Sequence, residues 1–529
     1  MVIEMADELS ATSEINSERH WADYRNVTQC ALRGEFQVAQ DSLAQLLRNV
    51  TETNLQARIH NDLGVLAAIQ GRSNDARDFF VAAQGLSPDW DTPRENLRHV
   101  PLDITGTPPE PPTPPNPSRK NRVAIVSLLF NWPSTGGGTV HTAELARFLT
   151  QAGYDVRHIV ICYDAWGVGQ ITDEVDWTIE RLEFDDANWN RSEIQRRVRH
   201  AVDRFAPDSV IITDSWNFKP RLAQALEGTR YFLRLAAQEC LCPLNNVRLL
   251  WSSNGTPTSC PQHQLATPAI CLDCVRERNR WSGSLHRAER ELSGHGGPDY
   301  DDCLKQAFAN ASGVLVVNPL IAEMVKPHTP RVHTIPSGFD SERFQWAPAM
   351  KSVGPIRILF AGLVDEQMKG FAVLQEACRR MWSQRQDFML LATADPPGRI
   401  DEFTSFIGWQ SQADLPRAMN DADIIVCPTI AEEALGRTAV EGMAAGRPVV
   451  ASRLGGLPFV VLDEATGLLC EPGDPNDLMR QLMRLIDDAD LREQFGRAGR
   501  RRFEQFYTWK VIIDRQYIPL LGSPVITYA

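Results

Sequence analysis

The chain has 529 residues, 43% of them hydrophobic and 23% charged, which are the proportions of a globular protein that folds in water. This length exceeds what one hydrophobic core organises, so we expect three domains. The net charge of −13 argues against a protein that binds nucleic acid, because neutralising phosphates requires an excess of Lys and Arg.

The N-terminal segment shows no targeting signal. Residues 1–8 lack a basic region followed by an apolar one, and no run in the chain approaches 18 uncharged apolar residues. We therefore expect a cytoplasmic protein with no signal peptide and no membrane span. Peripheral contact with the inner face of a membrane stays open, because a local basic patch can exist on an acidic chain.

The first hundred residues predict a helical module. Between residues 57 and 88, small and apolar side chains stand at the offsets of a tetratricopeptide repeat, which is a pair of closely packed helices. A weaker copy surrounds Phe36, and a third helix is expected near Asn96. Such repeats usually need three copies, so the module is expected to lean on the rest of the chain or on a partner protein; the alternative is a helical cap without a ligand. The residues at the offsets are Leu63, Gly64, Gly71, Ala76, Phe80, Ala83 and Pro88.

A proline-rich spacer and a glycine loop follow. Proline neither continues a helix nor pairs in a strand, so residues 108–117 predict an extended, semi-rigid linker. The apolar run Val123–Ser127 then predicts a buried strand, and an amphipathic helix is expected after Gly136, Gly137 and Gly138. Glycines between a strand and its helix let the backbone approach a ligand closely, although a plain loop has the same composition.

Five of the eleven cysteines crowd between residues 240 and 274 and predict a metal site. A Cys-x-x-Cys pair supplies two thiolates from one turn, and two thiolates from separate loops would complete a tetrahedral zinc site. Free thiols and disulfides are the alternatives, with disulfides disfavoured in a reducing compartment. The expected zinc ligands are Cys242, Cys260, Cys271 and Cys274, with Cys240 and His263 as substitutes.

A basic stretch follows the cysteines and is interrupted by Trp281. This stretch could meet anionic lipid headgroups or a diphosphate-lipid acceptor, but a solvated helix face is the favoured interpretation. Its basic residues are Arg276, Arg278, Arg280, Arg287 and Arg290.

Two glutamates separated by seven residues mark the most informative segment. The apolar run Asp423–Cys427 predicts a buried parallel strand, and residues 429–433 form the loop at its carboxyl end, where open sheets bind ligands. A helix expected from near Leu435 offers unpaired N–H groups to a phosphate or a sugar hydroxyl. Glu433 would meet a sugar at the helix mouth, while Glu441, about two turns further on, could accept hydrogen bonds from ribose. The alternative is a helix with two ordinary surface glutamates.

This segment resembles family 4 of the retaining glycosyltransferases. The signature of that family is a Glu, seven residues and a second Glu, followed by a Gly-x-Pro-Val-Val strand and a Gly-Gly loop. Here Glu433 and Glu441 precede Gly446–Val450 and Gly455-Gly456, and the resemblance covers roughly residues 122–520. It implies an α/β fold of GT-B architecture with two Rossmann-like domains and an interdomain cleft, preceded here by an all-α tetratricopeptide-like domain.

The resemblance implies transfer of a sugar from a UDP- or GDP-sugar to a glycan, lipid-linked or protein acceptor, with retention of configuration and no cofactor for catalysis. Glu433 would be the catalytic residue. Asp421-Ala422-Asp423 spells the Asp-x-Asp metal motif of the other glycosyltransferase fold, but inside this match we expect a polar helix-to-strand connection. The implied donor-binding residues are Gly137, Gly138, Lys369, Leu435, Gly436 and Glu441.

Two positions depart from the family pattern and keep rival hypotheses open. Leu363 stands where the family normally has an arginine, and residues 234–239 lack the family's His-Asp pair near the sugar. Gln238, Glu239 or His141 could occupy that space. One rival is a degenerate scaffold that binds partners through its helices. The other is a GT-B sugar-nucleotide epimerase, which needs titratable groups in the cleft and no acceptor site.

The predicted domain organisation follows from these segments. We expect a helical domain at 1–100, a proline-rich linker at 101–121, a first Rossmann-like domain at 122–340 with a cysteine-rich insertion at 238–290, a second, donor-binding one at 341–505, and a C-terminal helix at 506–529 that returns to the first.

Overall fold

The computed structural model describes most of the chain from residue 121 onward and parts of the first hundred residues. The predicted linker at 101–121 lies outside the described residues apart from Asn121, as do Gly71 and Pro88 of the predicted repeat. The described residues are 20–24, 26–27, 30, 36–50, 52–69, 73–87, 90, 92–93, 96, 121–134, 136–251, 257–329, 331–344, 346, 354–395 and 401–524.

The N-terminal region is helical, with α2 (Phe36–Leu47), α3 (Thr53–Ile69) and α4 (Ser73–Leu86). A side chain at Gly64 would place its Cβ 2.6 Å from Cε1 of Phe80, so the close packing of α3 on α4 requires the small residue. Arg501 of the second α/β domain stands over the Phe36 ring at 5.2 Å, and a cavity of about 530 Å³ lies between this region and that domain. The N-terminal helices therefore pack against the second α/β domain. Their assignment as tetratricopeptide repeats stays a prediction.

Within the described residues, the first α/β domain has a seven-stranded parallel sheet in the order β3-β2-β1-β4-β5-β8-β9. The predicted strand is β1 (Arg122–Ser127), and its Val123 lies beside Val156 of β2 and Ser209 of β4. Both faces of the sheet are buried, as the unbroken apolar runs indicated. The other strands are β2 (Asp155–Tyr163), β3 (Thr178–Phe184), β4 (Ser209–Thr213), β5 (Tyr231–Leu235), β8 (Gly313–Val316) and β9 (Val332–Thr334).

Helices cover both faces of this sheet. One face packs against α7, α8, α11 and α12, and the other against α6 and the last helices of the chain. The strand order, with β1 in the middle and crossovers on both sides, is that of a Rossmann-like domain. The helices are α6 (Gly137–Gln151), α7 (Arg191–Phe205), α8 (Lys219–Ala225), α11 (Tyr300–Asn310) and α12 (Pro319–Val325).

The cysteine-rich insertion lies between β5 and α11. It contains the antiparallel pair β6 (Leu249–Trp251) and β7 (Pro257–Ser259), then α9 (Pro268–Arg278) and α10 (Ser284–Ser293). The carboxylate of Glu289 on α10 is fully buried and accepts hydrogen bonds of 2.8 Å from three consecutive backbone N–H groups, those of residues 216–218. These bonds fix α10 on the loop that follows β4.

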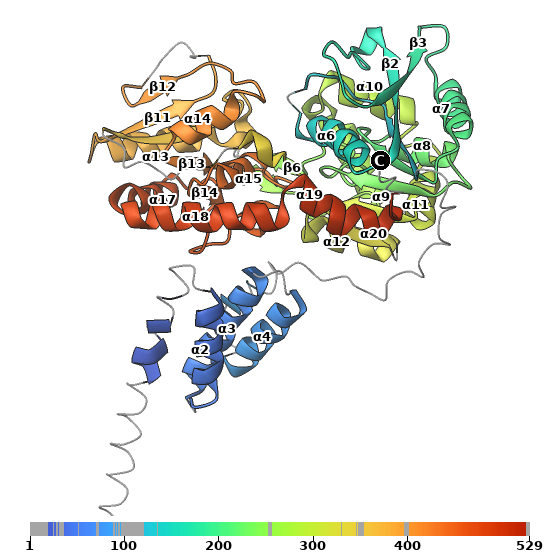
Figure 1. The fold of residues 1–529 in the computed structure, drawn as a ribbon. Coiled ribbons are helices and arrows are strands. Elements are labelled where there is room, and N and C mark those ends of the chain that lie inside the picture. The colour runs from blue at the N-terminus through green and yellow to red at the C-terminus, as the bar shows by residue number, and fades with distance from the viewer. Residues whose placement is uncertain are drawn as a thin grey trace, which may run out of the picture.

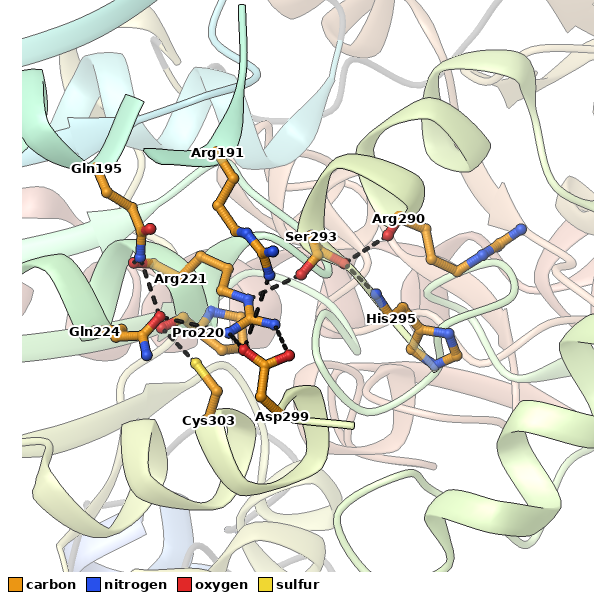
Figure 2. Close-up of polar contacts among 10 residues, drawn as sticks. All are labelled: Arg191, Gln195, Pro220, Arg221, Gln224, Arg290, Ser293, His295, Asp299 and Cys303. Carbon is orange, nitrogen blue, oxygen red and sulfur yellow. Dashed lines mark hydrogen bonds and ion pairs between the residues drawn. The ribbon is translucent and has the colours of Figure 1, made fainter. Parts of the chain in front are cut away.

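Figure 2 shows a second attachment of the insertion, around Arg221 of α8. The guanidinium donates two hydrogen bonds to the Asp299 carboxylate, at 2.8 and 3.1 Å, and a third to the Ser293 carbonyl at 2.8 Å. Arg191 of α7 forms an ion pair with Asp299 at 3.9 Å. Because Arg221 is buried, these charge-assisted bonds hold the end of α10 firmly against α7 and α8.

The second α/β domain has a parallel sheet in the order β12-β11-β10-β13-β14-β15 among the residues described. One face packs against α14, α15, α16 and α18, and the other against α13 and α17. The predicted strands appear as β13 (Ile424–Cys427) and β14 (Val449–Ser452), and the first strand of the domain along the chain is β10 (Ile356–Phe360). The remaining elements are β11 (Phe388–Ala392), β12 (Thr404–Phe406), β15 (Gly467–Cys470), α13 (Phe371–Trp382), α14 (Leu415–Asp421), α15 (Arg437–Ala444), α16 (Leu457–Val460), α17 (Pro475–Asp487) and α18 (Ala489–Phe506).

The chain returns to the first domain after α18. Figure 1 shows α18, in red-orange, along the second domain and then α19 (Trp509–Ile512) and α20 (Ile518–Leu521) against the first. A π-helical turn, Ile513–Tyr517, lies between them. Trp509 is buried in the core of the first domain, and Asn121 donates a hydrogen bond of 2.8 Å to the Leu521 carbonyl. This tail therefore connects both α/β domains.

Candidate active site

Lys369 and Glu433 form an ion pair at the carboxyl edge of the second sheet. The Lys369 Nζ atom lies 2.5 Å from Glu433 Oε1, and each side chain is about one third exposed or less. Burial disfavours the charged ammonium, but the carboxylate of Glu433 outweighs it, so the pKa of Lys369 lies above its ordinary value. The sequence placed both residues in one site, and the structure brings them into contact.

Backbone contacts fix the turn that carries Lys369. Gly370 has φ of +74°, and a Cβ there would lie 1.9 Å from the Pro428 carbonyl oxygen, so only glycine fits. The Met368 carbonyl accepts hydrogen bonds from Thr429 Oγ1 at 2.7 Å and from the Ile430 N–H at 2.9 Å. The turn before α13 and the loop after β13 thus form one unit, which sets the Lys369–Glu433 geometry.

The Gly-Gly turn packs on the other side of the same loop. The Gly456 N–H donates a hydrogen bond of 2.6 Å to the Glu433 carbonyl, and a Cβ on Gly456 would lie 2.1 Å from the Ala434 oxygen. No side chain fits in that space. Residues 428–436, hereafter the donor loop, are therefore held between two glycine turns.

Helix α15 begins at Arg437, two residues later than predicted. Gly436 precedes it in the left-handed conformation, with φ of +83°, which interrupts the helical backbone before Arg437. Leu435 packs in the hydrophobic core, so only its backbone could meet a ligand. Glu441 lies on α15 and is 3% exposed; burial raises the pKa of its carboxyl, and the charges of Arg437 and Arg343 oppose that rise.

The glycine loop of the first domain faces the start of α15. Gly137 is the first residue of α6, and a Cβ on it would lie 2.9 Å from Cδ of Arg437. Gly138 follows, and a Cβ there would lie 3.3 Å from Cβ of Ala236. Gly137 of the first domain thus lies against the first residue of α15 in the second, and we call this place the domain junction.

Two side chains of the first domain hold the donor loop from across the junction. Gln238 Nε2 donates to Glu432 Oε2 at 2.7 Å, and Asn318 Nδ2 donates to the Ala434 carbonyl at 2.6 Å. Arg248 of the insertion adds an ion pair with Glu432 at 3.5 Å. These contacts join segments about 100 to 200 residues apart, and the local sequence gives no signal for them.

The structure separates the three candidates for the space near residue 237. Gln238 reaches the donor loop, whereas the Glu239 carboxylate accepts hydrogen bonds from the backbone N–H groups of Ala236 and Ala237. His141 is fully buried beside Trp509, with ring centroids 5.2 Å apart. Burial, and then the charges of Arg234 and Arg437, hold the pKa of His141 well below its ordinary value.

A buried polar chain lies at the carboxyl edge of the first sheet, and sequence reasoning missed it. Ser127 Oγ lies 2.8 Å from His158 Nε2 and donates to Asp214 Oδ2 at 3.1 Å. Burial raises the pKa of Asp214 to about 6, although hydrogen bonds and Lys219 oppose it, and burial lowers the pKa of His158 to about 3. Ser127 and His158 are fully buried, so they support Asp214 and do not meet a substrate.

Arg437 is the other residue that sequence reasoning missed. Its guanidinium lies 4.2 Å from the centre of the Phe339 ring and forms distant ion pairs with Glu144, at 3.6 Å, and Glu441, at 3.9 Å. Its position directly after Gly436, between the two glutamates of the signature, was the available signal. A cation at the first residue of a helix that faces the other domain is suited to an anionic ligand.

The four predicted zinc ligands line one cavity of about 350 Å³ in the insertion, whereas Cys240 faces the Trp216 carbonyl instead. Burial, followed by neighbouring thiols, raises the pKa of Cys271 to about 12. All eleven cysteines are free thiols. Across the described part of the chain, no three His, Cys, Asp or Glu side chains are arranged to hold a metal ion, so the zinc site stays a prediction.

Two further interpretations of the sequence can be compared with the structure. Asp423 lies between the end of α14 and the start of β13 and accepts a hydrogen bond of 2.8 Å from the Arg357 N–H. This confirms the predicted polar helix-to-strand connection. The basic stretch is not one solvated face, because Arg290 is 5% exposed and donates to the Pro243 carbonyl at 2.8 Å. No helix in the described ranges has both the length and the apolar character needed to cross a bilayer.

Residues 355–488, most of the second α/β domain, match the family model described as glycosyl transferases group 1. The phosphatidyl-myo-inositol mannosyltransferase of Mycobacterium tuberculosis is 34% identical over 209 residues, which cover 36% of this chain and 54% of that protein. The MMP alpha-(1->4)-mannosyltransferase of Mycolicibacterium hassiacum is 29% identical over 244 residues, which cover 44% of this chain and 56% of that protein. The chain spans about half the length of these curated relatives.

Solved structures match over most of the chain. Sucrose-phosphate synthase of Thermosynechococcus elongatus has a TM-score of 0.54 at 17% identity, and the match covers 76% of this chain and 99% of that one. HepE of Anabaena in complex with UDP and glucose has a TM-score of 0.51 at 14% identity, with the same coverage. These likenesses confirm the predicted GT-B architecture. The protein therefore has the GT-B fold, and its second domain matches the group 1 glycosyltransferases.

Proposed function

We propose that this protein is a glycosyltransferase that transfers a sugar from a UDP- or GDP-sugar with retention of configuration. The observation that carries the proposal is the Lys369–Glu433 pair, held between two glycine turns in the domain that matches the group 1 glycosyltransferases. Two similar proteins are named mannosyltransferases, and a structural neighbour is described with UDP and glucose, which support a nucleotide-sugar donor.

The chemistry assigned to the site follows from the charges of the reaction. The bond from the anomeric carbon to the phosphate oxygen breaks, and the diphosphate leaves with the electron pair. Lys369 and the first amides of α15 would stabilise that negative charge. Gly137 and Gly138 would let the diphosphate approach the first domain closely. Leu435 and Gly436 would contribute backbone contacts. Glu441 would accept hydrogen bonds from the ribose hydroxyls.

Glu433 is proposed as the catalytic residue that stabilises the oxocarbenium-like sugar. The acceptor hydroxyl would attack from the face that the diphosphate leaves, and its proton would pass to the departing phosphate oxygen, so that configuration is retained without a metal. The acceptor is a glycan, a lipid-linked molecule or a protein. A structural zinc ion and a protein partner for the N-terminal helices stay predictions beside this function.

The test is release of nucleoside diphosphate from a panel of UDP- and GDP-sugars, with and without candidate acceptors. We expect slow hydrolysis by the wild-type protein and a loss of at least about 100-fold in Glu433→Ala, with an unchanged melting temperature. The anomeric configuration of the product, measured by NMR, tests retention. Equal turnover in wild type and Glu433→Ala would contradict the role of Glu433.

The scaffold hypothesis makes the opposite prediction. Leu363 is 43% exposed where the family normally has a cation, which is the observation in its favour. A scaffold would bind partners through α2 to α4 and release no nucleoside diphosphate from any sugar nucleotide. The same assay therefore decides between the two functions.

A further inference from the structure

The guanidinium of Arg437 lacks hydrogen-bond partners although it is largely shielded from water. Its side chain is 15% exposed, and in the described part of the chain neither Nη1 nor Nη2 makes a hydrogen bond. A buried donor without an acceptor is costly, and for a charged group the cost is larger still. Such a group is expected where a ligand supplies the acceptor.

The two carboxylates near Arg437 are poor substitutes for such an acceptor. Glu144 lies 3.6 Å from Nη2, but it already accepts from Trp509 Nε1 at 3.0 Å and from Arg343 at 3.3 Å. Glu441 lies at 3.9 Å, beyond hydrogen-bonding distance. Both carboxylates attract the guanidinium and orient it without satisfying its N–H groups.

The surroundings of Arg437 fit an anion with several oxygens. A Cβ on Gly137 would lie 2.9 Å from Cδ of Arg437, so the Arg437 side chain packs directly against the glycine loop of the first domain. His141 of α6 is fully buried near Arg437, and both its ring nitrogens lack hydrogen-bond partners within the ranges described. Unpaired nitrogen atoms of two side chains thus gather at the domain junction.

Helix α15, which carries Arg437, contacts the segment just before the position where the family's second cation is missing. Thr438, its neighbour on α15, donates a hydrogen bond of 3.2 Å to the Ala361 carbonyl, which precedes Gly362 and Leu363. Lys369 is already paired with Glu433. A nucleotide diphosphate carries at least two negative charges, and one ammonium that is shared with a carboxylate does not neutralise them.

From these contacts we propose that Arg437 binds the diphosphate of the donor and replaces the cation that is missing at position 363. The proposal rests on the proposed function, because it names the residue that recognises the leaving group of that reaction. Arg437 would donate two N–H groups to phosphate oxygens, a geometry for which a guanidinium is well suited. Glu144 and Phe339 would be positioning residues that aim it.

The test compares the binding of UDP, GDP, UMP and GMP to the full chain by calorimetry. In Arg437→Gln we expect the affinity for the preferred diphosphate to fall at least about tenfold, and that for the matching monophosphate much less, because a charge-assisted contact to the second phosphate is lost. The diphosphate affinity of Arg437→Lys should lie between that of the wild-type protein and that of Arg437→Gln. Arg497→Gln, which removes an exposed arginine on α18, should match wild type.

A rescue variant separates ligand binding from a purely structural role. Adding Leu363→Arg to Arg437→Gln should restore most of the diphosphate affinity, because it returns a cation to the neighbouring position. Glu144→Gln, which weakens the interdomain ion pair that orients the guanidinium but keeps the cation itself, should reduce the diphosphate affinity clearly less than Arg437→Gln does. If Glu144→Gln weakens binding as much as Arg437→Gln and Leu363→Arg rescues nothing, Arg437 only holds the domains together.

The outcomes distinguish this inference from the function beneath it. Equal diphosphate affinity in wild type and Arg437→Gln would overturn the role of Arg437 and leave the transferase intact. A wild-type protein that binds no nucleoside diphosphate and releases none from sugar nucleotides would overturn both. Circular dichroism of each variant shows whether a loss of binding comes with a loss of fold.

Discussion

The donor loop and the cysteine-rich insertion both reach the domain junction, yet they are held in different ways. The donor loop is fixed by backbone contacts at Gly370 and Gly456 that leave no room for a side chain. The insertion is fixed by side chains, chiefly Glu289 and Arg221, that bind backbone and carboxylate groups. The first arrangement depends on small residues at set spacings, so it leaves a signature in the sequence; the second arises from distant polar residues and leaves none.

The largest effect is expected from a side chain added against the donor loop. Gly456→Ala would put a Cβ 2.1 Å from the Ala434 oxygen and must displace the loop that carries Glu433. We expect the transferase activity to be lost and the stability of the protein to fall by roughly 1–3 kcal/mol, measured by turnover and melting temperature. The control is Gly283→Ala in the insertion, where a Cβ meets nothing within 4 Å. Full activity in Gly456→Ala would show that the loop is not held as described.

Metal removal tests the insertion as a whole. If the four thiols that line its cavity bind zinc, elemental analysis should find about one zinc ion per chain, and chelation should lower the melting temperature by several degrees. Cys271→Ser should lose the metal, and Cys378→Ser, at a buried thiol of the other domain, should retain it. Protein that contains no zinc, and whose melting temperature does not change on chelation, would contradict the zinc site. Polar side chains alone would then stabilise the insertion.

A variant of Glu289 tests whether side chains alone hold the insertion. Glu289→Gln replaces one carboxylate oxygen by an NH2 group, which cannot accept a hydrogen bond, so at least one of the backbone N–H groups of residues 216–218 loses its acceptor. We expect a loss of about 2–3 kcal/mol and faster hydrogen exchange in α10, with little change in nucleotide affinity. Slower exchange in the donor loop than in α10 would agree with this picture. An equal increase of hydrogen exchange in α10 and in the donor loop would mean that the two regions are not held independently.

The smallest effect is expected from the charge of Asp214. Its pKa is raised from 3.8 to about 6, so between pH 4 and 6 the folded state binds more protons than the unfolded state, and stability falls as the pH rises through that window. Asp214→Asn removes the buried charge and should raise stability at pH 7 by about 2 kcal/mol while flattening the profile between pH 4 and 6. Chemical unfolding at several pH values measures this, and a profile that keeps its slope in Asp214→Asn would place the titrating group elsewhere.

The sequence predicted the parts of the fold that depend on local periodicity. The buried strands β1 and β13 were visible as apolar runs, and the resemblance that began at Glu433 predicted two Rossmann-like domains. It also put Lys369 and Glu433 in one site, where they are 2.5 Å apart. Such features are recoverable because strand burial and glycine turns impose their own spacing on the chain.

The remaining parts of the site depend on which distant segments meet. Gln238 and Glu432 come from different domains, so neither local sequence indicates that they bind. Arg290 looked like one of several solvated arginines, but its carbonyl partner at Pro243 lies on a loop 47 residues away. Arg437 was overlooked because the resemblance drew attention to the position of Leu363, whereas the cation stands on the neighbouring helix.

The most direct measurement is a crystal structure of the full chain with the nucleoside diphosphate that it binds. We predict the diphosphate at the domain junction, with one phosphate near Lys369 and the start of α15, the other on the guanidinium of Arg437, and Glu433 facing the position of the sugar. A diphosphate bound elsewhere, with Lys369 and Glu433 still paired only to each other, would contradict the account.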